Sequence, residues 1–179
     1  MTSITANWAL PGASLALVQL PAPTLAALAG DDLTGARLAT PLVLPAYLAT
    51  PECTSVWRRR QQQIAESPGD AAWVTRLIVD TGLNTAVGRA GFHGPPDTAG
   101  MVELGYSVDP DFRRLGYARL ALATMLHMAA AAPNVRTVRA TISPDNLPSR
   151  TLVEEFGFVE NGEQWDEEDG LEIIFEVPA

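Results

Sequence analysis

The order of predicted elements along this chain indicates an α/β fold with a mixed sheet that carries helices on both faces. In the second half, strand and helix patterns follow one another as strand–helix–strand–helix–strand–strand. The helix pattern over 117–131 is apolar nearly all round, which is typical of a helix buried against a sheet. A length of 179 residues suits one domain with a sizeable core, so we expect a single domain over 1–179.

The first half has its clearest signal at Thr50-Pro51-Glu52. A hydroxyl that can cap a helix, a proline in the first turn and an acid at the positive end of the dipole predict a helix start. In that helix, we expect Val56, Trp57 and Ile64 to share the buried face and residues 58–63 to face water mostly. The predicted elements of this half are strands over 15–20, 72–79 and 84–92 and helices over 24–30 and 50–66.

The second half contains a strand over 101–108 with clear alternation. One face of this strand carries Val102, Leu104, Tyr106 and Val108, and the other carries Glu103, Gly105 and Ser107. The helix over 147–156 has Asn146 or Asp145 as its cap and ends at Gly157, in the left-handed conformation. The other predicted elements are the helix over 117–131 and strands over 135–142, 158–165 and 171–177.

A loop of small residues, Arg113-Arg114-Leu115-Gly116-Tyr117-Ala118, joins the strand over 101–108 to the helix over 117–131. The first N–H groups of a helix have no partner within it, and the dipole favours an anion there. Gly116 and Ala118 let a ligand approach the backbone closely, while Arg113 and Arg114 can add positive charge. The loop therefore predicts a site for a phosphate or pyrophosphate.

Three motifs in this chain resemble those of the GNAT superfamily, the Gcn5-related N-acetyltransferases. The loop 113–118 fits the pattern (Gln/Arg)-x-x-Gly-x-(Gly/Ala). The segment 146–152, Asn-Leu-Pro-Ser-Arg-Thr-Leu, with Phe-Gly-Phe at 156–158, is similar to the second family motif. Glu-Leu-Gly-Tyr at 103–106 resembles a strand of the branch that includes ribosomal-protein N-terminal acetyltransferases. Together the motifs span about residues 101 to 158.

The resemblance implies the GNAT fold, with a central, mostly antiparallel mixed sheet, and acetyl-coenzyme A as co-substrate. It places the pyrophosphate on the backbone N–H groups of Arg113, Arg114, Leu115, Gly116, Tyr117 and Ala118. It pairs the pantetheine amides with the main chain of Tyr106, Ser107 and Val108, like an added strand. Beyond this strand the sheet of the family splays, which leaves room for the thioester beside a strand N–H that polarises its carbonyl.

Acetyl transfer to an amine requires a neutral amine, and Glu103 is our candidate for the general base, directly or through water. A carboxylate in an otherwise apolar strand can have its pKa raised by desolvation, toward the range that suits deprotonation. The alternative is that Glu103 faces solvent or pairs with an arginine such as Arg76 or Arg139.

The helix over 147–156 carries two further candidates, Asn146 and Ser149, which lie on one face. The resemblance places Asn146 at the pantetheine or a neighbouring strand and Ser149 near the sulfur. Asn146 as an N-cap alone is the alternative. Many family members protonate the leaving thiolate with a tyrosine directly after the motif's leucine, and here Val153 fills that position. The resemblance to the ribosomal branch suggests Ser149, relaying a proton through water, in this role. Catalysis need not depend on it, since coenzyme A is a fairly good leaving group.

Composition excludes several classes of function. Twelve basic and 21 acidic residues give a formal net charge of −9, which argues against nucleic acid or an anionic membrane as partner. One cysteine and two separated histidines leave no metal-ligand cluster. The prolines in the N-terminal apolar stretch argue against a signal peptide or a membrane span. The acidic turn over 166–170 is either a solvated hairpin tip or an attractor for a cationic amine.

Several single residues have two interpretations each. His127 is expected in the core or near its helix end, and His93 in a loop where a substrate contact is the less favoured role. Cys53 is expected to be an ordinary small apolar residue. We expect Trp57 and Trp73 in the core, and Trp8 and Trp165 either in a substrate cleft or packed on the surface.

The sequence thus predicts a cytoplasmic N-acetyltransferase that uses acetyl-coenzyme A and no metal, and acetylates a primary amine within a ternary complex. A peptide N-terminus and a small-molecule amine both remain open as acceptors, and so do monomer and homodimer. One alternative is a non-catalytic acyl-coenzyme A sensor, to which Val153 lends weight. The other is an unrelated nucleotide-binding protein, although the chain lacks both lysine and a Walker-type phosphate loop.

Overall fold

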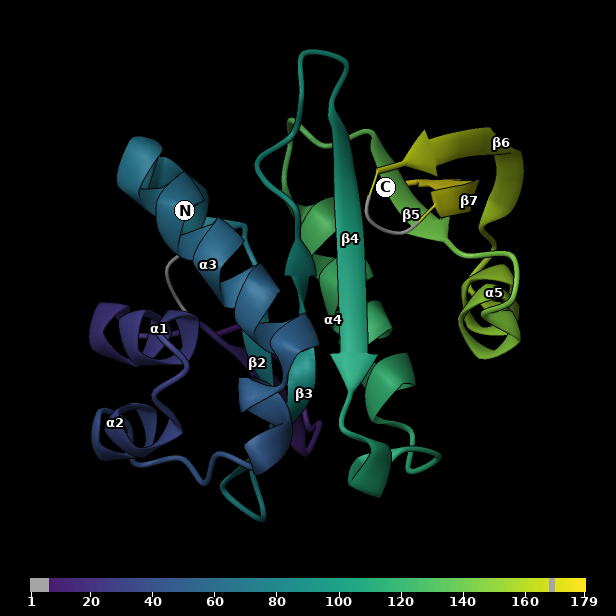
Figure 1. Cartoon of the computed structure of the whole chain (residues 1–179). Coiled ribbons are helices and arrows are strands. Elements are labelled where there is room, and N and C mark those ends of the chain that lie inside the picture. The colour runs from purple at the N-terminus through teal and green to yellow at the C-terminus, as the bar shows by residue number, and fades with distance from the viewer. Residues whose placement is uncertain (1–6, 168–169) are drawn as a thin grey trace.

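A seven-stranded sheet organises the computed structural model, which describes residues 7–167 and 170–179 (Figure 1). The strands lie in the order β1-β2-β3-β4-β5-β7-β6. Only β4 and β5 run parallel, and every other neighbouring pair is antiparallel. The predicted mixed, mostly antiparallel sheet is therefore confirmed. The strands are β1 (Leu15–Val18), β2 (Arg76–Asp80), β3 (Thr85–Phe92), β4 (Met101–Val108), β5 (Thr137–Ile142), β6 (Val159–Asp166) and β7 (Gly170–Pro178).

Helices cover both faces of the sheet, as predicted. On one face, α3 packs with α1 over a core that includes Leu77, Val79 and Ala86. On the other face, α4 packs against β4, β3 and β1. Figure 1 shows α3 in front of the sheet, α4 behind β4, and α5 beside β5. We call these two sides the α3 face and the α4 face. The helices are α1 (Ala22–Ala29), α2 (Leu33–Leu38), α3 (Pro51–Glu66), α4 (Tyr117–Ala131) and α5 (Leu147–Glu155).

The elements nearest the predicted site have the expected bounds. β4 and α4 begin and end where the sequence pattern places them. Gly116 is the N-cap of α4, with a φ of 87°, in the left-handed region that glycine adopts without strain. Asn146 caps α5, and Gly157 after its end has a φ of 82°. Local backbone chemistry therefore fixes both helix starts that face the site.

Some predicted bounds were wrong. Residues 72–75 do not belong to β2, because a short 3₁₀ turn over Pro68–Ala72 precedes that strand. Helix α2 and a 3₁₀ turn over Ala46–Ala49 were missed. The Asp32 side chain accepts a hydrogen bond from Gly35 N at the start of α2, so an N-cap signal was present. Six residues are too few for a helical period to stand out.

Several burial predictions also need correction. Trp8 is 2% exposed and belongs to the core, not to a cleft or the surface. We expected Arg60 to face water, but it is only 7% exposed. It is accommodated there because its guanidinium donates to Thr75 Oγ1 and to the His93 carbonyl. His127 is exposed on the outer side of α4, so this helix is buried along one face only. The Thr50 hydroxyl donates to the Tyr47 carbonyl and does not cap α3.

The remaining aromatic and sulfur predictions fare better. Trp57 and Cys53, on the inner side of α3, are fully buried, as expected. Trp73 is half-buried against the core, and Trp165 is 76% exposed on β6. The acidic turn includes residues 168–169, which lie outside the described part of the chain. No helix within residues 7–167 and 170–179 has the length and apolarity that a membrane crossing requires.

Candidate active site

The site begins where β4 and β5 separate. These parallel strands pair only at Met101↔Thr137, Val102↔Val138 and Glu103↔Arg139. From Leu104 onward, β4 continues beside β3 alone, while β5 stays with β7. The sheet therefore opens between the two strands, as the family resemblance implied.

The free edge of β4 presents backbone hydrogen-bonding groups to this opening. The Glu103 carbonyl accepts from His93 N, and Asp109 N donates to the Val87 carbonyl, so both groups face β3. Backbone groups of an antiparallel pair alternate in direction from one residue to the next. Those of Leu104, Tyr106 and Val108 consequently point away from β3, into the opening. This edge suits an extended ligand that pairs like a strand.

A cleft of about 1070 Å³ lies along this edge, between the end of β4, the start of α4 and α5. It brings together nearly all residues predicted to touch the cofactor. Leu115 does not line the cleft and is 65% exposed. The predicted residues that line it are Tyr106, Ser107, Val108, Arg113, Arg114, Gly116, Tyr117, Ala118, Asn146 and Ser149.

Backbone N–H groups at the start of α4 face this cleft without protein partners. The first bond of the helix runs from Leu120 N to the Gly116 carbonyl. The N–H groups over 114–119 have no hydrogen-bond partner among the described residues. An added Cβ at Gly116 would meet no atom within 4 Å, so open space lies next to the backbone. The site can therefore accept an anion at the positive end of the helix dipole.

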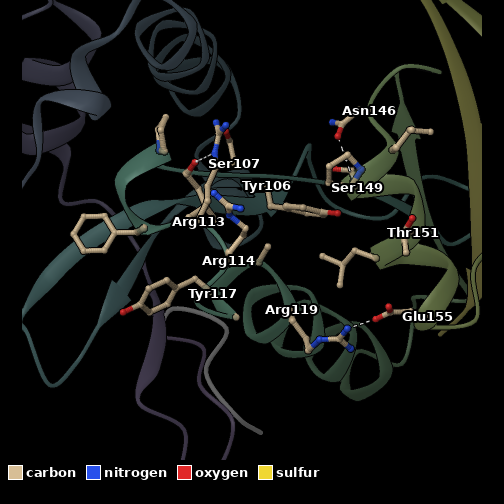
Figure 2. A pocket seen from close by; sticks show the side chains of 18 residues that line it. Tyr106, Ser107, Arg113, Arg114, Tyr117, Arg119, Asn146, Ser149, Thr151 and Glu155 are labelled. Carbon is tan, nitrogen blue, oxygen red and sulfur yellow. Dashed lines mark hydrogen bonds and ion pairs between the residues drawn. The ribbon is translucent and has the colours of Figure 1, made fainter.

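The arginines near this loop have different roles. Arg113 folds back, and its Nε donates a 3.0 Å hydrogen bond to the Val108 carbonyl, which braces the end of β4. Arg114 holds a left-handed φ of 62° and lines the cleft with its side chain (Figure 2). Arg119 forms an ion pair with Glu155 of α5, across the far side of the cleft. Arg114 thus supplies charge near the free N–H groups, while Arg113 is structural.

Ser149 and Tyr106 meet from opposite sides of the opening. The Asn146 side chain caps α5 by accepting from Ser149 N at 3.3 Å, and it also lines the cleft. The Tyr106 ring extends from β4 toward Ser149 (Figure 2). Burial raises the pKa of the Tyr106 hydroxyl, and the neighbouring Ser149 hydroxyl opposes that shift. The two oxygens do not reach hydrogen-bonding geometry, so the buried phenol oxygen has no partner among the described residues.

A second cavity, of about 390 Å³, adjoins the cleft at the split in the sheet. Three residues line both spaces, namely Tyr106, Asn146 and Ser149. The other lining residues come from β4, β5, the loop after β5, and β7, and they include Gly105, Thr141 and Glu172. Molecules in the two spaces would therefore meet beside Tyr106 and Ser149.

Glu103 lies on the α3 face and lines neither space directly. Its Oε1 accepts a 2.8 Å hydrogen bond from Thr141 Oγ1, and Thr141 lines the smaller cavity. Neither predicted arginine partner is used: Arg139 pairs with Glu176, and Arg76 donates to the Ala72 carbonyl. The Glu103 side chain is 22% exposed, so it is neither free in solvent nor sealed in the core.

His93 is the second neighbour of Glu103, with its Nδ1 3.4 Å from Glu103 Oε1. Partial burial and the positive charges of Arg60, Arg59 and Arg89 lower the pKa of His93 to about 4. The ring is therefore neutral at neutral pH, and it lies beside the carboxylate. An added Cβ at Gly105 would lie 3.0 Å from His93 Nε2, so glycine makes room for the ring over β4.

Two tyrosines stabilise the walls of the cleft. The Tyr117 hydroxyl donates a 2.7 Å hydrogen bond to Asp80 Oδ2, which ties the start of α4 to the end of β2. This bond raises the pKa of Tyr117 to about 12 and lowers that of Asp80. The Tyr47 and Ser107 hydroxyls lie 2.5 Å apart, and burial raises the pKa of Tyr47 to about 12. These contacts join segments far apart in the sequence and were not predicted.

Val153 is fully buried in the core beside α4, so the position where many family members carry a tyrosine does not face the cleft in this chain. Within residues 7–167 and 170–179, no group of three His, Cys, Asp or Glu side chains could hold a metal ion. The polar side chains near the split of the sheet include those of Tyr106, Thr141, Ser143, Asn146, Ser149 and Glu172, with Glu103 bonded to Thr141.

The chain belongs to the GNAT acetyltransferase family, because the model of the acetyltransferase (GNAT) domain matches residues 22–159. Over 98 residues it is 31% identical to an uncharacterised N-acetyltransferase, YjdG, of Bacillus subtilis (strain 168). That match spans 55% of this chain and only 58% of the relative.

Solved structures share the fold over nearly the whole chain. A ribosomal-protein-S5-alanine acetyltransferase from Vibrio fischeri superposes with a TM-score of 0.67 and 17% identity, covering 97% of this chain and 96% of that one. A chimera of the spermidine N-acetyltransferase SpeG from Vibrio cholerae with hSSAT gives 0.66 and 16%, covering 93% and 96%. Two further structures of this fold contain coenzyme A or acetyl-coenzyme A. At these identities the likeness establishes the fold.

Proposed function

We propose that this chain transfers an acetyl group from acetyl-coenzyme A to a primary amine, by direct attack within a ternary complex. The observation that carries the proposal is the junction of two spaces beside Tyr106 and Ser149. One space adjoins unpartnered helix N–H groups and a free strand edge, which suits a long anionic donor. The other reaches the α3 face, from which a second substrate can approach.

In this proposal the donor lies along the large cleft. The N–H groups over 114–119 bind its pyrophosphate, helped by the Arg114 guanidinium. Its pantetheine amides pair with the backbone of Tyr106 and Val108, which faces the opening. The Val108 carbonyl already accepts from Arg113, and its second lone pair remains for this contact. The side-chain amide of Asn146, at the N-terminus of α5, is a further hydrogen-bond donor toward the pantetheine.

Glu103 is the proposed base. Thr141 Oγ1 links its carboxylate to the smaller cavity, so a proton can leave the amine through a water at Thr141 and pass to Glu103. The neutral His93 ring lies 3.4 Å from the same oxygen, on its other side. As the amine nitrogen bonds to the thioester carbon, the C–S bond breaks and its electron pair moves to sulfur. Ser149 is the proposed group that delivers a proton to that thiolate, through water.

The acceptor class in this proposal is a primary amine, either a peptide N-terminus or a small molecule. Among the structural neighbours, one is named for ribosomal protein S5 and another for spermidine. Both kinds of acceptor therefore occur on this fold. A cytoplasmic site of action stays part of the proposal, and monomer and homodimer both remain compatible with it.

The test is a thiol-release assay with acetyl-coenzyme A and a panel of amines, followed by mass detection of the acetylated product. The expected result is release that requires the amine and a product heavier by one acetyl group. A chain that binds coenzyme A, raising its Tm, but releases thiol with no amine or peptide would instead be a non-catalytic binding module.

A further inference from the structure

The smaller cavity has a charged wall that none of the roles above uses. Glu172 of β7 lines this cavity and is only 9% exposed. Among the described residues the one hydrogen bond to its carboxylate comes from Gln164 Nε2, 2.9 Å from Oε2, and the carboxylate forms no ion pair. Burying a carboxylate beside a neutral amide leaves its charge uncompensated, which is costly unless a cation binds.

The strand register places Glu172 on the same face of the sheet as Glu103. On β5, Thr141 is paired with Ile174 of β7. Arg139, also on β5, is paired with Glu176 of β7 on one side and with Glu103 of β4 on the other. Residues that face each other in register share a face, and so do residues two apart along a strand. Glu172 therefore points to the α3 face, about 7 Å along the strands from the Thr141–Ile174 pair. Thr141 in turn binds Glu103. One carboxylate, Glu172, thus lines the cavity next to Ser149, and a second, Glu103, is bonded to Thr141 in its wall.

The hydroxyl of Tyr106, whose residue also lines this cavity, has no hydrogen-bond partner among the described residues. This hydroxyl is buried, and its residue lines the large cleft as well. A buried hydroxyl normally has a partner, so an unpaired one next to a cavity indicates that a ligand or water completes it. A neutral phenol oxygen can accept a hydrogen bond from an ammonium group.

We propose that the acceptor is an amine that carries a second positive charge, and that Glu172 binds this second charge. The inference rests on the proposed acetyl transfer and narrows its acceptor. The reacting nitrogen lies near Tyr106 and Ser149, where the two spaces join, and is served by Glu103 through Thr141. The other cation lies against Glu172, deeper in the cavity of about 390 Å³. An alkyl diamine has this arrangement of charges, whereas a peptide N-terminus followed by uncharged side chains does not.

The experiment compares 1,4-diaminobutane with butylamine, which has the same carbon chain and a single amine. The wild-type kcat/KM is expected to be about 10-fold or more higher for the diamine, after correction for its two equivalent amines. A hydrogen bond to a charged group contributes enough free energy for a difference of this size. Glu172→Gln keeps the shape and removes the charge. It should raise KM for the diamine by about 10-fold and leave kcat/KM for butylamine nearly unchanged. If Glu172→Gln does not fold, Glu172→Met is measured in its place, with the same expectation.

The matched control is Glu176→Gln, on the same strand and face but paired with Arg139 and outside the cavity. It should keep the preference for the diamine. A binding readout that needs no turnover is the rise in Tm with 1,4-diaminobutane alone, expected in the wild type and lost in Glu172→Gln. The inference is overturned if the Glu172 variant keeps the diamine preference. It is also overturned if the wild type acetylates the N-terminus of a peptide with only uncharged side chains faster than it acetylates 1,4-diaminobutane. Thiol release with no amine at all would count against the acetyl transfer itself.

Discussion

Thr141 and Glu103 bridge the two strands at the point where the sheet divides. The Thr141 hydroxyl donates a 2.8 Å hydrogen bond to Glu103 Oε1, although the last β4–β5 pair is Glu103↔Arg139. The side-chain bond thus extends the connection between the strands by two residues beyond their backbone pairing. It holds a carboxylate near the edge of the smaller cavity, where the proposed reaction requires a base for the amine.

Glu103→Gln should lower kcat by about 100-fold or more, the usual range for a lost general base, because the amide accepts no proton at neutral pH. Affinity for coenzyme A should stay within about twofold, since Glu103 does not line the large cleft. Steady-state kinetics and calorimetry measure the two quantities. Glu163→Gln, on the exposed edge strand β6, is the control. Wild-type turnover in Glu103→Gln would remove this residue from the mechanism.

Gly116→Glu should weaken coenzyme A binding by more than about 100-fold. The new side chain places bulk and negative charge beside the free N–H groups of α4, and the φ of 87° strains any residue other than glycine. Gly12→Glu is the matched control, because Gly12 also has a positive φ, 74°, and also has no atom within 4 Å of an added Cβ. Titration calorimetry compares the two variants. Equal affinities in both would show that the pyrophosphate binds elsewhere.

Ser149→Ala should reduce kcat by about 10-fold, less than a typical general acid provides, because a thiolate is a fairly good leaving group. The Asn146 cap is expected to survive, since it uses Ser149 N and not the hydroxyl. A melting curve checks that helix α5 is intact, and Ser55→Ala on α3 serves as a control for the loss of a hydroxyl. Full activity in Ser149→Ala would show that Ser149 is not needed and that solvent protonates the leaving thiolate.

Tyr117→Phe should lower the free energy of unfolding at pH 7 by about 1 kcal/mol, since it removes a hydrogen bond to a carboxylate. That bond lowers the pKa of Asp80. A carboxyl whose folded pKa is depressed contributes stability above its unfolded pKa of about 4, and this contribution is lost as the pH falls through the folded value. The difference between wild type and variant should therefore shrink between about pH 4 and pH 2.

Urea denaturation at several pH values measures this difference. Tyr47→Phe is the control, because the partner of Tyr47 is the neutral Ser107 hydroxyl and the loss should not depend on acid. A Tyr117 variant whose deficit is the same at pH 7 and at low pH would contradict a charged Asp80 as the partner.

Local patterns determined much of the framework of this protein. The alternation of 101–108 and the glycine at 116 gave β4 and the start of α4 their observed bounds. Asn146 and Gly157 did the same for the ends of α5. Short-range backbone chemistry decides such features, so the residues themselves are sufficient to predict them. The positions of the cofactor candidates on β4 and on the loop before α4 were predictable for the same reason, since these residues lie on the elements just named.

The surroundings of each side chain were decided only by the tertiary structure. Glu103 meets His93 and Thr141 because β3 and β5 flank β4, and neither neighbour is encoded in the strand pattern. Arg60 and Trp8 are buried for the same reason, since Arg60 donates to the His93 carbonyl and Trp8 packs on Phe92, both distant in sequence. The uncompensated charge of Glu172 also arises from strand order, since β7 inserts between β5 and β6. Alternation reports which face a residue is on, but only the packing of distant strands determines what it meets there.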